Sequence, residues 1–288
     1  MMEDFDELEG LLRSKRFLER ASQVGPLERP PMETLGNSLW EARHILTHLP
    51  LKSMVGQRIL EVGAGLGIVS AYLEKKGTRV EAVEPAVTAF GDYGKLLPLV
   101  HEILEAKFTI HSCSVEDFSA KQNGFYDLIF SHNALEHMQD LEGSLRVMRD
   151  LLAPQGRMVH SCPNYYFSYE PHYGIWMVPF FPRVTRVFSV KVRADPAVWD
   201  SLNFVTAGKI KNVARHIGCS VGFKEGTMHE ALVRLENDPV FAGRQNGWPR
   251  RIHGWLKRAS LLEWVRFFPA NWTTPMVFCL TPTTEKIV

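Results

Sequence analysis

The sequence predicts an α/β fold in which a parallel sheet is covered by helices on both faces. Between residues 58 and 162, short apolar runs alternate with segments that carry apolar residues at helical spacing. This alternation is typical of parallel strands joined by crossover helices. The first apolar run ends in three glycines at alternate positions, Gly63, Gly65 and Gly67. In such sheets the carboxyl ends of the strands bind ligands, so the glycines mark a candidate site.

The individual elements follow from the apolar spacing and the turn residues. Helices that cover the main domain are predicted around a proline-containing linker, at 4–20 and 35–48. Five strands are predicted at 58–62, 79–84, 108–113, 126–131 and 157–162, the last one opened by a Pro-Gln-Gly turn. Connecting helices are predicted at 67–76, 96–104 and 141–152. Beyond an aromatic-rich stretch, we expect a helix at 207–217 and strands at 219–224 and 275–281.

These patterns divide the chain into three segments: an N-terminal helical cover (1–56), a ligand-binding core (57–163), and a C-terminal segment (164–288). The last segment is expected to hold an insertion that acts as a substrate lid, followed by the helix and strands that complete the sheet. It carries 16 Lys and Arg against 9 Asp and Glu, a net charge of +7. This excess suggests either an anionic partner or a basic face exposed to solvent.

Bulk composition excludes some classes of protein. The formal net charge of +1 argues against a dedicated nucleic-acid binder. Four cysteines without a C-x-x-C pair favour a reducing compartment. The chain opens with the acidic stretch MMEDFDELEG, which does not resemble a signal peptide, and no apolar run is long enough to span a bilayer. We therefore expect a cytoplasmic protein.

The glycine loop does not fit a dinucleotide. The dinucleotide fingerprint G-x-G-x-x-G requires its third glycine at position 68, where this chain has Ile68. Glu61, two residues before the first glycine, would also repel a pyrophosphate. Glu84 ends the next predicted strand, where an acid can accept hydrogen bonds from the hydroxyls of a ribose. The alternative for Glu84 is an ordinary exposed acid at a strand end.

Four stretches in register carry a resemblance to a known family: E-V-G-A-G-L-G, V-E-P, S-V-E-D-F and Y-D-L-I-F-S-H-N-A-L-E-H. In order and spacing they resemble the class I S-adenosylmethionine-dependent methyltransferases, and most closely the methyltransferase type 11, ubiquinone-biosynthesis O-methyltransferase-like branch. The resemblance covers residues 57–163. It implies a Rossmann-like seven-stranded sheet, S-adenosyl-L-methionine as cofactor, and a transferase activity.

The resemblance also implies roles for individual residues. The loop backbone approaches the methionine portion and the ribose, Glu61 holds the amino group through water, and Glu84 takes the ribose hydroxyls. The cationic sulfonium and ammonium of this cofactor agree with nearby carboxylates. Residues after the third strand frame the adenine, and residues after the fourth line the methionine moiety. The full set is Glu61, Gly63, Ala64, Gly65, Gly67, Glu84, Ser114, Val115, Glu116, Ser131 and His132.

Two positions depart from the family pattern. Ser114 stands where many relatives carry an acid for the adenine amino group, and Glu116 or Asp117 are candidate replacements. Asn133 stands where the ubiquinone branch has an acid that helps to hold a divalent metal, so only Glu136 and His137 of that element remain. We therefore expect no metal.

Methyl transfer to a hydroxyl needs a base. Our first candidate is His137 and our second is His172, and His132 is a third. The alternative for Glu136 and His137 is that they cap and orient the following helix. His160 lies inside a predicted strand and is expected to be a packed histidine.

Two aromatic-rich stretches remain open in their interpretation. The aromatic residues of 164–183 either wall a substrate pocket or form core, and we expect a mixture; they are Tyr165, Tyr166, Phe167, Tyr169, Tyr173 and Trp176. Residues 244–264 combine Arg and Lys with Trp and Leu, which is typical of an amphipathic basic helix. This helix contacts a membrane surface, binds a phosphate-bearing acceptor, or packs on the domain.

The leading hypothesis is O-methylation of a small-molecule, sugar or glycan acceptor. N-methylation is the nearest alternative, because it needs no strong base. A non-catalytic module that binds S-adenosylmethionine is a second alternative.

Overall fold

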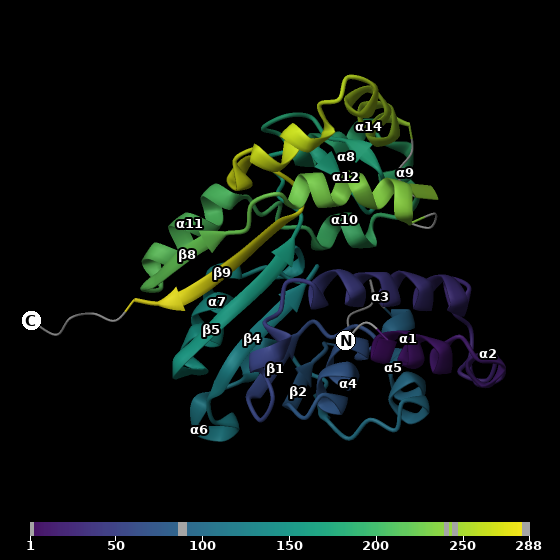
Figure 1. The fold of residues 1–288 in the computed structure, drawn as a ribbon, viewed down its shortest axis with the longest axis vertical. Helices are drawn as coiled ribbons and strands as arrows, with labels where there is room; N and C mark the ends of the chain where they lie inside the picture. Colours follow the sequence, from purple (N-terminus) through teal and green to yellow (C-terminus); the bar gives the residue numbers. More distant parts are fainter. Residues whose placement is uncertain (1–2, 86–90, 239–241, 244–246, 284–288) are drawn as a thin grey trace, which may run out of the picture. The chain divides into compact units, whose positions relative to one another are not determined.

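The computed structural model describes residues 3–85, 91–238, 242–243 and 247–283 (Figure 1). The chain forms two compact units. The first comprises Met1–His132 and Arg146–Val159, and the second comprises Asn133–Leu145 and His160–Val288. The division into 1–56, 57–163 and 164–288 remains a prediction from the sequence.

Parallel strands form the centre of the first unit: β1 (Arg58–Val62), β2 (Arg79–Val83), β3 (Thr109–His111) and β4 (Tyr126–His132). β1 pairs in parallel with β2 on one side and with β4 on the other, and β2 pairs in parallel with β3. The strand order therefore reverses between β1 and β4. Open parallel sheets bind ligands beyond the carboxyl ends of the strands at such a reversal.

Helices of the first unit are α4 (Ile68–Lys75), α5 (Gly91–Ile103) and the short α6 (Ala120–Asn123), with 3-10 turns η1 (Leu51–Ser53) and η3 (Val115–Asp117). Three N-terminal helices precede the sheet: α1 (Glu3–Leu12), α2 (Lys15–Ala21) and α3 (Pro31–Leu46). α3 packs on α4 and α5, and α1 and α2 pack on α5. The single helix predicted at 4–20 is thus divided in two, and Ser14 adopts an extended conformation at the break.

The fifth strand belongs to both units. β5 (Leu152–Cys162) follows α7 (Leu141–Asp150), and its last three residues lie in the second unit. The predicted Pro-Gln-Gly turn at 154–156 is wrong, because these residues are already part of the strand. A Cβ atom on Gly156 would lie only 2.8 Å from the carbonyl oxygen of Tyr126. The glycine therefore permits a close approach of two backbones rather than a turn.

The whole sheet has seven strands in the order β3-β2-β1-β4-β5-β9-β8, which confirms the predicted fold class. In the second unit, β8 (Cys219–Phe223) and β9 (Met276–Pro282) are antiparallel, and Cys219 is paired with Pro282. α11 (Ala207–His216) packs on β8. These three elements lie close to their predicted positions.

The rest of the second unit consists of short elements. A hairpin follows β5 and is formed by β6 (Tyr169–Glu170) and β7 (Ile175–Trp176). Short helices and turns follow it: η5 (Pro182–Val184), α8 (Thr185–Phe188), α9 (Val190–Ala194) and α10 (Ala197–Ser201). Beyond β8 come α12 (Thr227–Asn237), α14 (Trp248–Arg258), η6 (Leu262–Phe267) and η7 (Ala270–Trp272), and η4 (Leu135–His137) precedes α7.

A buried asparagine joins distant parts of the second unit. Asn164 follows β5, and its Nδ2 donates to the carbonyl oxygens of Asn271 and Thr273 at 3.0 and 2.9 Å. Its Oδ1 accepts from the backbone N–H groups of Tyr166 and Ala207, both at 3.2 Å. All the hydrogen-bonding groups of this side chain are therefore used, as burial requires.

Within the described parts of the chain, no helix is both long enough and apolar enough to cross a lipid bilayer.

Candidate functional site

The glycine loop between β1 and α4 has three residues in the left-handed region: Gly63, Gly65 and Gly67, with φ of 77°, 54° and 69°. The N–H of Gly63 donates to the carbonyl oxygen of Val83 at 2.8 Å, which holds the loop over the end of β2. Glycine is the residue that adopts this conformation without a steric cost.

The glycines differ in what surrounds them. A Cβ on Gly67 would lie 3.0 Å from the ring of Phe108 and 3.1 Å from Leu97, so a side chain there would press on both residues. A Cβ on Gly65 would have its nearest neighbours in the ring of Tyr93, at 4.0 Å. Within the part of the chain that the structure describes, open space therefore adjoins the backbone of Gly65, which is what the approach of a ligand needs.

Glu61 lies in β1 with only 4% of its surface exposed. Its Oε2 accepts hydrogen bonds from the hydroxyl and the backbone N–H of Ser70, at 2.5 and 3.1 Å. Ser70 is in the first turn of α4, so the carboxylate satisfies one of the N–H groups that a helix start leaves unpaired. Burial and, less strongly, the neighbouring Glu84 raise the pKa of Glu61 to about 8, although the bonds from Ser70 oppose this shift.

Glu84 follows β2 and turns toward the glycine loop. Its Oε2 accepts a hydrogen bond from the backbone N–H of Gly65 at 2.6 Å. Burial raises the pKa of Glu84 to about 7, even though the bond from Gly65 lowers it. The site thus holds two carboxyl groups with raised pKa values, and a bound cation would favour their ionised forms. This chemistry suits a ligand that carries both positive charge and hydroxyl groups.

The segment after β3 is closed by a capping box. Asp117 accepts hydrogen bonds at Oδ2 from the backbone N–H and the hydroxyl of Ser114, at 3.1 and 3.3 Å. One of the two replacement acids that the sequence suggested for the adenine amino group is therefore engaged in a local turn. The other, Glu116, is exposed, and Val115, which precedes it, is buried.

At the end of β4, Ser131 is fully buried and His132 is half-buried. The ring of His132 lies 5.4 Å from the ring of His44, which lies 4.6 Å from the ring of His48. His44 lies in α3 and His48 lies just after it, and neither was predicted from the sequence. Their spacing of four residues, which places two side chains on one face of a helix, was the available signal.

The second unit holds a glutamate–histidine pair. His172 lies in the loop of the β6–β7 hairpin, and its Nδ1 is 2.5 Å from Oε1 of Glu170. Glu170 is fully buried, and its Oε2 accepts from the backbone N–H of Tyr173 at 2.8 Å. Although burial alone would raise the pKa of Glu170, His172 and these hydrogen bonds lower it below its usual value. An ionised Glu170 fixes the proton of His172 on Nδ1 and leaves Nε2 as the basic atom.

His137 is placed differently. Its Nδ1 lies 2.7 Å from the hydroxyl of Ser201, and that hydroxyl donates to the carbonyl oxygen of Val198 at 2.7 Å. With the proton of Ser201 directed at Val198, Nδ1 of His137 is the donor in this contact. Burial, together with the nearby His172, lowers the pKa of His137 to about 3. A histidine with so low a pKa is a weak base near neutral pH.

The two histidine candidates meet beside a third residue. The rings of His137 and His172 are 5.5 Å apart, and potential ligand atoms of Glu136, His137 and His172 lie within 4.8 Å of one another. Asn203 holds the turn that carries Glu136 and His137, because its Nδ2 donates to the carbonyl oxygens on both sides of them, at 2.7 Å. One carboxylate and two imidazoles suit a divalent cation chemically. The expectation of no metal stays a prediction.

Two further predictions concern packing. His160 is fully buried in β5, its ring lies 5.4 Å from that of Phe278, and burial lowers its pKa to about 3. It is the packed histidine that we expected. The aromatic segment is a mixture of core and surface: Tyr165 and Tyr169 are buried, whereas Tyr166 is exposed.

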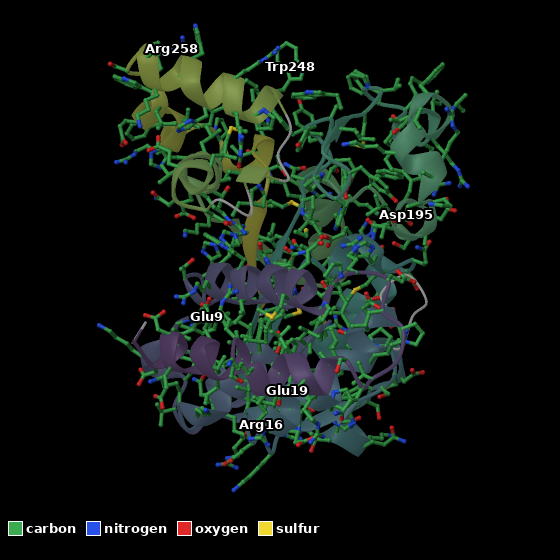
Figure 2. The ribbon with its side chains drawn as sticks, turned by 90° about the vertical axis from the view of Figure 1, so that its right-hand side faces the viewer. Glu9, Arg16, Glu19, Asp195, Trp248 and Arg258 are labelled. Carbon is green, nitrogen blue, oxygen red and sulfur yellow. The ribbon has the colours of Figure 1, made fainter. Side chains whose placement is uncertain are left out.

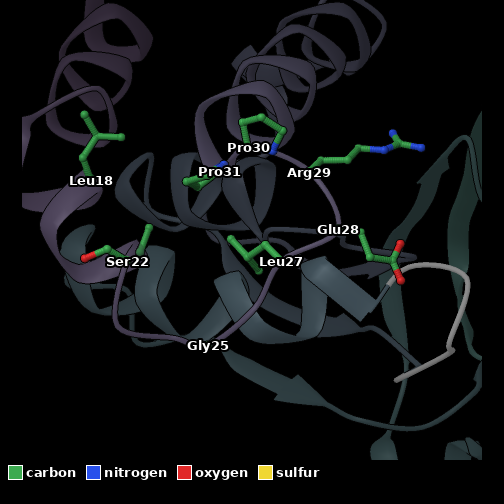
Figure 3. A pocket seen from close by; sticks show the side chains of 9 residues that line it. Leu18, Ser22, Gly25, Leu27, Glu28, Arg29, Pro30 and Pro31 are labelled. Carbon is green, nitrogen blue, oxygen red and sulfur yellow. The ribbon is translucent and has the colours of Figure 1, made fainter.

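The first unit also contains a hollow of about 530 Å³ beside α2 and the linker that follows it (Figure 3). Leu18, Leu27 and Pro30 supply apolar side chains to its wall. None of the predicted cofactor-binding residues lines this hollow.

Comparisons with known proteins agree with the geometry. A family profile described as "Methyltransferase domain" matches residues 32–221. An uncharacterized protein of Mycobacterium tuberculosis is 34% identical over 203 residues, which cover 67% of this chain and 68% of the relative. A ubiquinone biosynthesis O-methyltransferase of Aromatoleum aromaticum is 28% identical over 117 residues, covering 40% of this chain and 47% of the relative. The chain thus spans about half the length of that ubiquinone relative.

A solved structure shows the same fold. The S-adenosylmethionine-dependent methyltransferase from Mesorhizobium loti aligns with a TM-score of 0.53 at 16% identity, covering 86% of this chain and 98% of the other. At this identity the likeness shows the fold alone.

Substitution by alanine should destabilise the protein to different extents at Gly65 and Gly67. Both Gly65→Ala and Gly67→Ala place a side chain at positive φ, at a cost of about 1–2 kcal/mol. Gly67→Ala also forces a methyl group against Phe108 and Leu97, which adds about 1–3 kcal/mol. Urea unfolding should therefore show a larger loss of stability for Gly67→Ala than for Gly65→Ala. Equal losses would contradict the distinction between a packing glycine and a ligand-facing one.

The pKa of Glu61 predicts a pH-dependent stability of the protein without ligand. Because the pKa is raised on folding, the stabilisation by the protonated form is complete below the unfolded value of 4.5 and is lost as the pH rises to about 8. Between these values the free energy of unfolding should fall by up to about 1.4 kcal/mol per pH unit from this group.

Glu61→Gln should flatten this dependence in urea unfolding measured at several pH values. Glu7→Gln, which removes an exposed acid of α1, is the matched control and should leave it unchanged. A wild-type slope in Glu61→Gln would show that Glu61 is not the group responsible.

Proposed function

We propose that this chain, which belongs to the methyltransferase-domain family, transfers the methyl group of S-adenosylmethionine to a hydroxyl oxygen of a small molecule, sugar or glycan. The observation that carries this proposal is the Glu170–His172 pair, since a hydroxyl acceptor must lose a proton and an amine need not. The ubiquinone biosynthesis O-methyltransferases among the relatives support an oxygen acceptor.

The glycine loop fits the methyl donor. S-adenosylmethionine supplies a methyl group that is already activated by a sulfonium. We assign the ribose hydroxyls to Glu84, the amino group to Glu61, and the close backbone approach to Gly65. The open space at Gly65 and the raised pKa values of the two acids support this assignment. Gly67 keeps a supporting role through its packing, and Gly63 and Ala64 shape the loop.

The remaining predicted cofactor residues keep lesser roles in the proposal. Ser114 and Val115 frame the adenine through a turn that the capping box holds rigid. Ser131 and His132 line the methionine moiety at the end of β4, where His44 supports the ring of His132.

We assign the general base to His172 rather than to His137, which was our first candidate. Glu170 orients the ring of His172 and stabilises the imidazolium that forms when Nε2 accepts the proton of the acceptor hydroxyl. The pKa of about 3 makes His137 unsuitable for this step. His137 instead contacts the ring of His172 and helps to position it. Part of the His172 side chain, 28%, is exposed, as a residue that meets a substrate requires.

The cofactor assignment predicts the effect of removing one acid. Glu84→Gln should weaken the binding of S-adenosylmethionine by about 1.5–3 kcal/mol, the contribution of hydrogen bonds to a charged group. Isothermal titration calorimetry measures this difference. Wild-type affinity should also rise between pH 6 and 8, because the carboxylate forms as the pH passes about 7. That rise should be smaller in Glu84→Gln.

Glu19→Gln, which removes an exposed acid of α2, is the control for this titration (Figure 2). Unchanged affinity in Glu84→Gln would remove Glu84 from the site.

The base assignment predicts a selective loss of turnover. His172→Gln should lower kcat by about 10²–10⁴-fold while the affinity for S-adenosylmethionine stays the same. Glu170→Gln should lower kcat less, because the ring remains but loses its carboxylate. The assay is the transfer of a labelled methyl group from S-adenosylmethionine to acceptors in a cell extract, with mass spectrometry of the product.

His216→Gln, at an exposed histidine of α11, is the matched control and should keep full activity. Full activity in His172→Gln would exclude it as the base, and a product methylated on nitrogen would overturn the proposed acceptor. Binding of the cofactor without transfer to any acceptor would favour a non-catalytic module.

A further inference from the structure

The helix α14 carries an exposed apolar stripe. Trp248, Ile252 and Trp255 are spaced by four and three residues, so they share one face of the helix. The two tryptophans are 58% and 59% exposed. Figure 2 shows Trp248 and Arg258, at the two ends of α14, on the outer edge of the second unit. The stripe is therefore not the face that packs on the domain.

A different face of α14 makes the packing contacts. α14 packs on α12, and His253 lies 2.8 Å from Glu236 of that helix. His253 and Leu256 are half-buried, whereas the stripe residues are exposed. The helix is thus held in place by one face while the tryptophans remain available.

The turn η6 extends the apolar surface. Val265 is buried and anchors the turn, whereas Trp264 and Phe267 are 67% and 71% exposed. The two exposed rings lie 6.1 Å apart. Large exposed aromatic residues in a group mark interaction sites on soluble domains. We call residues 248–268 the aromatic–basic surface.

Positive charge surrounds these aromatic side chains. The aromatic–basic surface contains five basic residues and one acid, Glu263, which is paired with Arg266. Arg251 and Arg258 are helical neighbours of the tryptophan stripe, and the guanidinium of Arg251 lies 6.0 Å from the ring centre of Trp248. Among the residues that the structure describes, no acid pairs with Arg250, Arg251 or Arg258. Arg244, which belonged to the predicted basic helix, lies outside the described residues.

A second segment of the same unit has the same character. Residues 180–193 contain four basic residues and no acid, and their exposed residues include Phe180, Phe181 and Phe188. Figure 1 draws α8, from this segment, and α14 toward the same end of the second unit. Arg186 of this segment pairs with Asp200 of α10, so the two stretches combine exposed aromatic rings with an excess of positive charge that is only partly paired.

We propose that the aromatic–basic surface binds the surface of an anionic lipid bilayer. Tryptophan and phenylalanine enter the boundary between headgroups and acyl chains, while Arg251 and Arg258 contact lipid phosphates. Each basic residue near such a surface contributes about 1 kcal/mol, or about fivefold in binding. A second copy of the chain is a poorer occupant, because two surfaces with the same excess of positive charge repel each other.

Sedimentation with lipid vesicles tests the proposal on the full chain. The protein should bind vesicles of phosphatidylcholine mixed with phosphatidylglycerol and should not bind phosphatidylcholine alone. Salt at about 0.5 M should weaken this binding, because it screens the basic side chains. Trp255→Ala/Trp264→Ala and Arg251→Glu/Arg258→Glu should each reduce binding by about tenfold or more. All four side chains are exposed, so both variants should keep the wild-type circular dichroism.

Matched controls lie in the first unit. Phe125→Ala removes an exposed phenylalanine, and Lys15→Glu/Arg16→Glu reverses two exposed charges on α2. Both should bind vesicles like the wild type. The proposal is overturned by no binding to the anionic vesicles, or by equal losses in the controls. It is also overturned if light scattering shows a dimer that the tryptophan variant dissociates while no vesicles are bound.

Discussion

A carboxylate removed from water needs hydrogen-bond donors. The region around the glycine loop of the first unit supplies such donors to two acids. Glu61 is buried in the central strand, and Ser70 in the first turn of α4 supplies two donors to it. Glu84 takes a donor from the backbone of the glycine loop. Glu61 therefore links β1 to α4, and Glu84 links the end of β2 to the glycine loop. These donors only partly offset the effect of burial on the two pKa values, which remain raised. A positively charged ligand would therefore stabilise the ionised form of both acids.

The second unit places one histidine beside an ionised carboxylate. Glu170 is ionised in spite of its burial because His172 and the backbone of the hairpin loop supply donors. His137 is close by, but its environment keeps it neutral and weakly basic. Two histidines in contact thus differ in chemistry because one faces a carboxylate and the other faces a hydroxyl. This contrast is why we assign the general base to His172.

Local patterns in the sequence predicted the strands, the glycine loop and the acids at the strand ends, because periodicity and turn residues act over short distances. The features that could not be predicted depend on contacts between distant residues. Phe108 explains Gly67, Ser201 sets the tautomer of His137, and Tyr126 explains why Gly156 lies in a strand rather than a turn. The burial that lowers the pKa of His137 is likewise not visible in the sequence, and the ranking of His137 before His172 stays a prediction.

The hairpin that carries His172 also has a consequence for how the protein can diversify. The acid, the imidazole and the supporting backbone N–H lie within four consecutive residues, Glu170–Tyr173. One tight loop therefore supplies most of the Glu170–His172 pair, and the hydroxyl of Tyr165, from the surrounding aromatic stretch, adds a donor to Oε1 of Glu170 at 3.3 Å. Substitutions elsewhere in that stretch can therefore alter its shape while the pair stays intact, as long as position 165 keeps a hydroxyl donor.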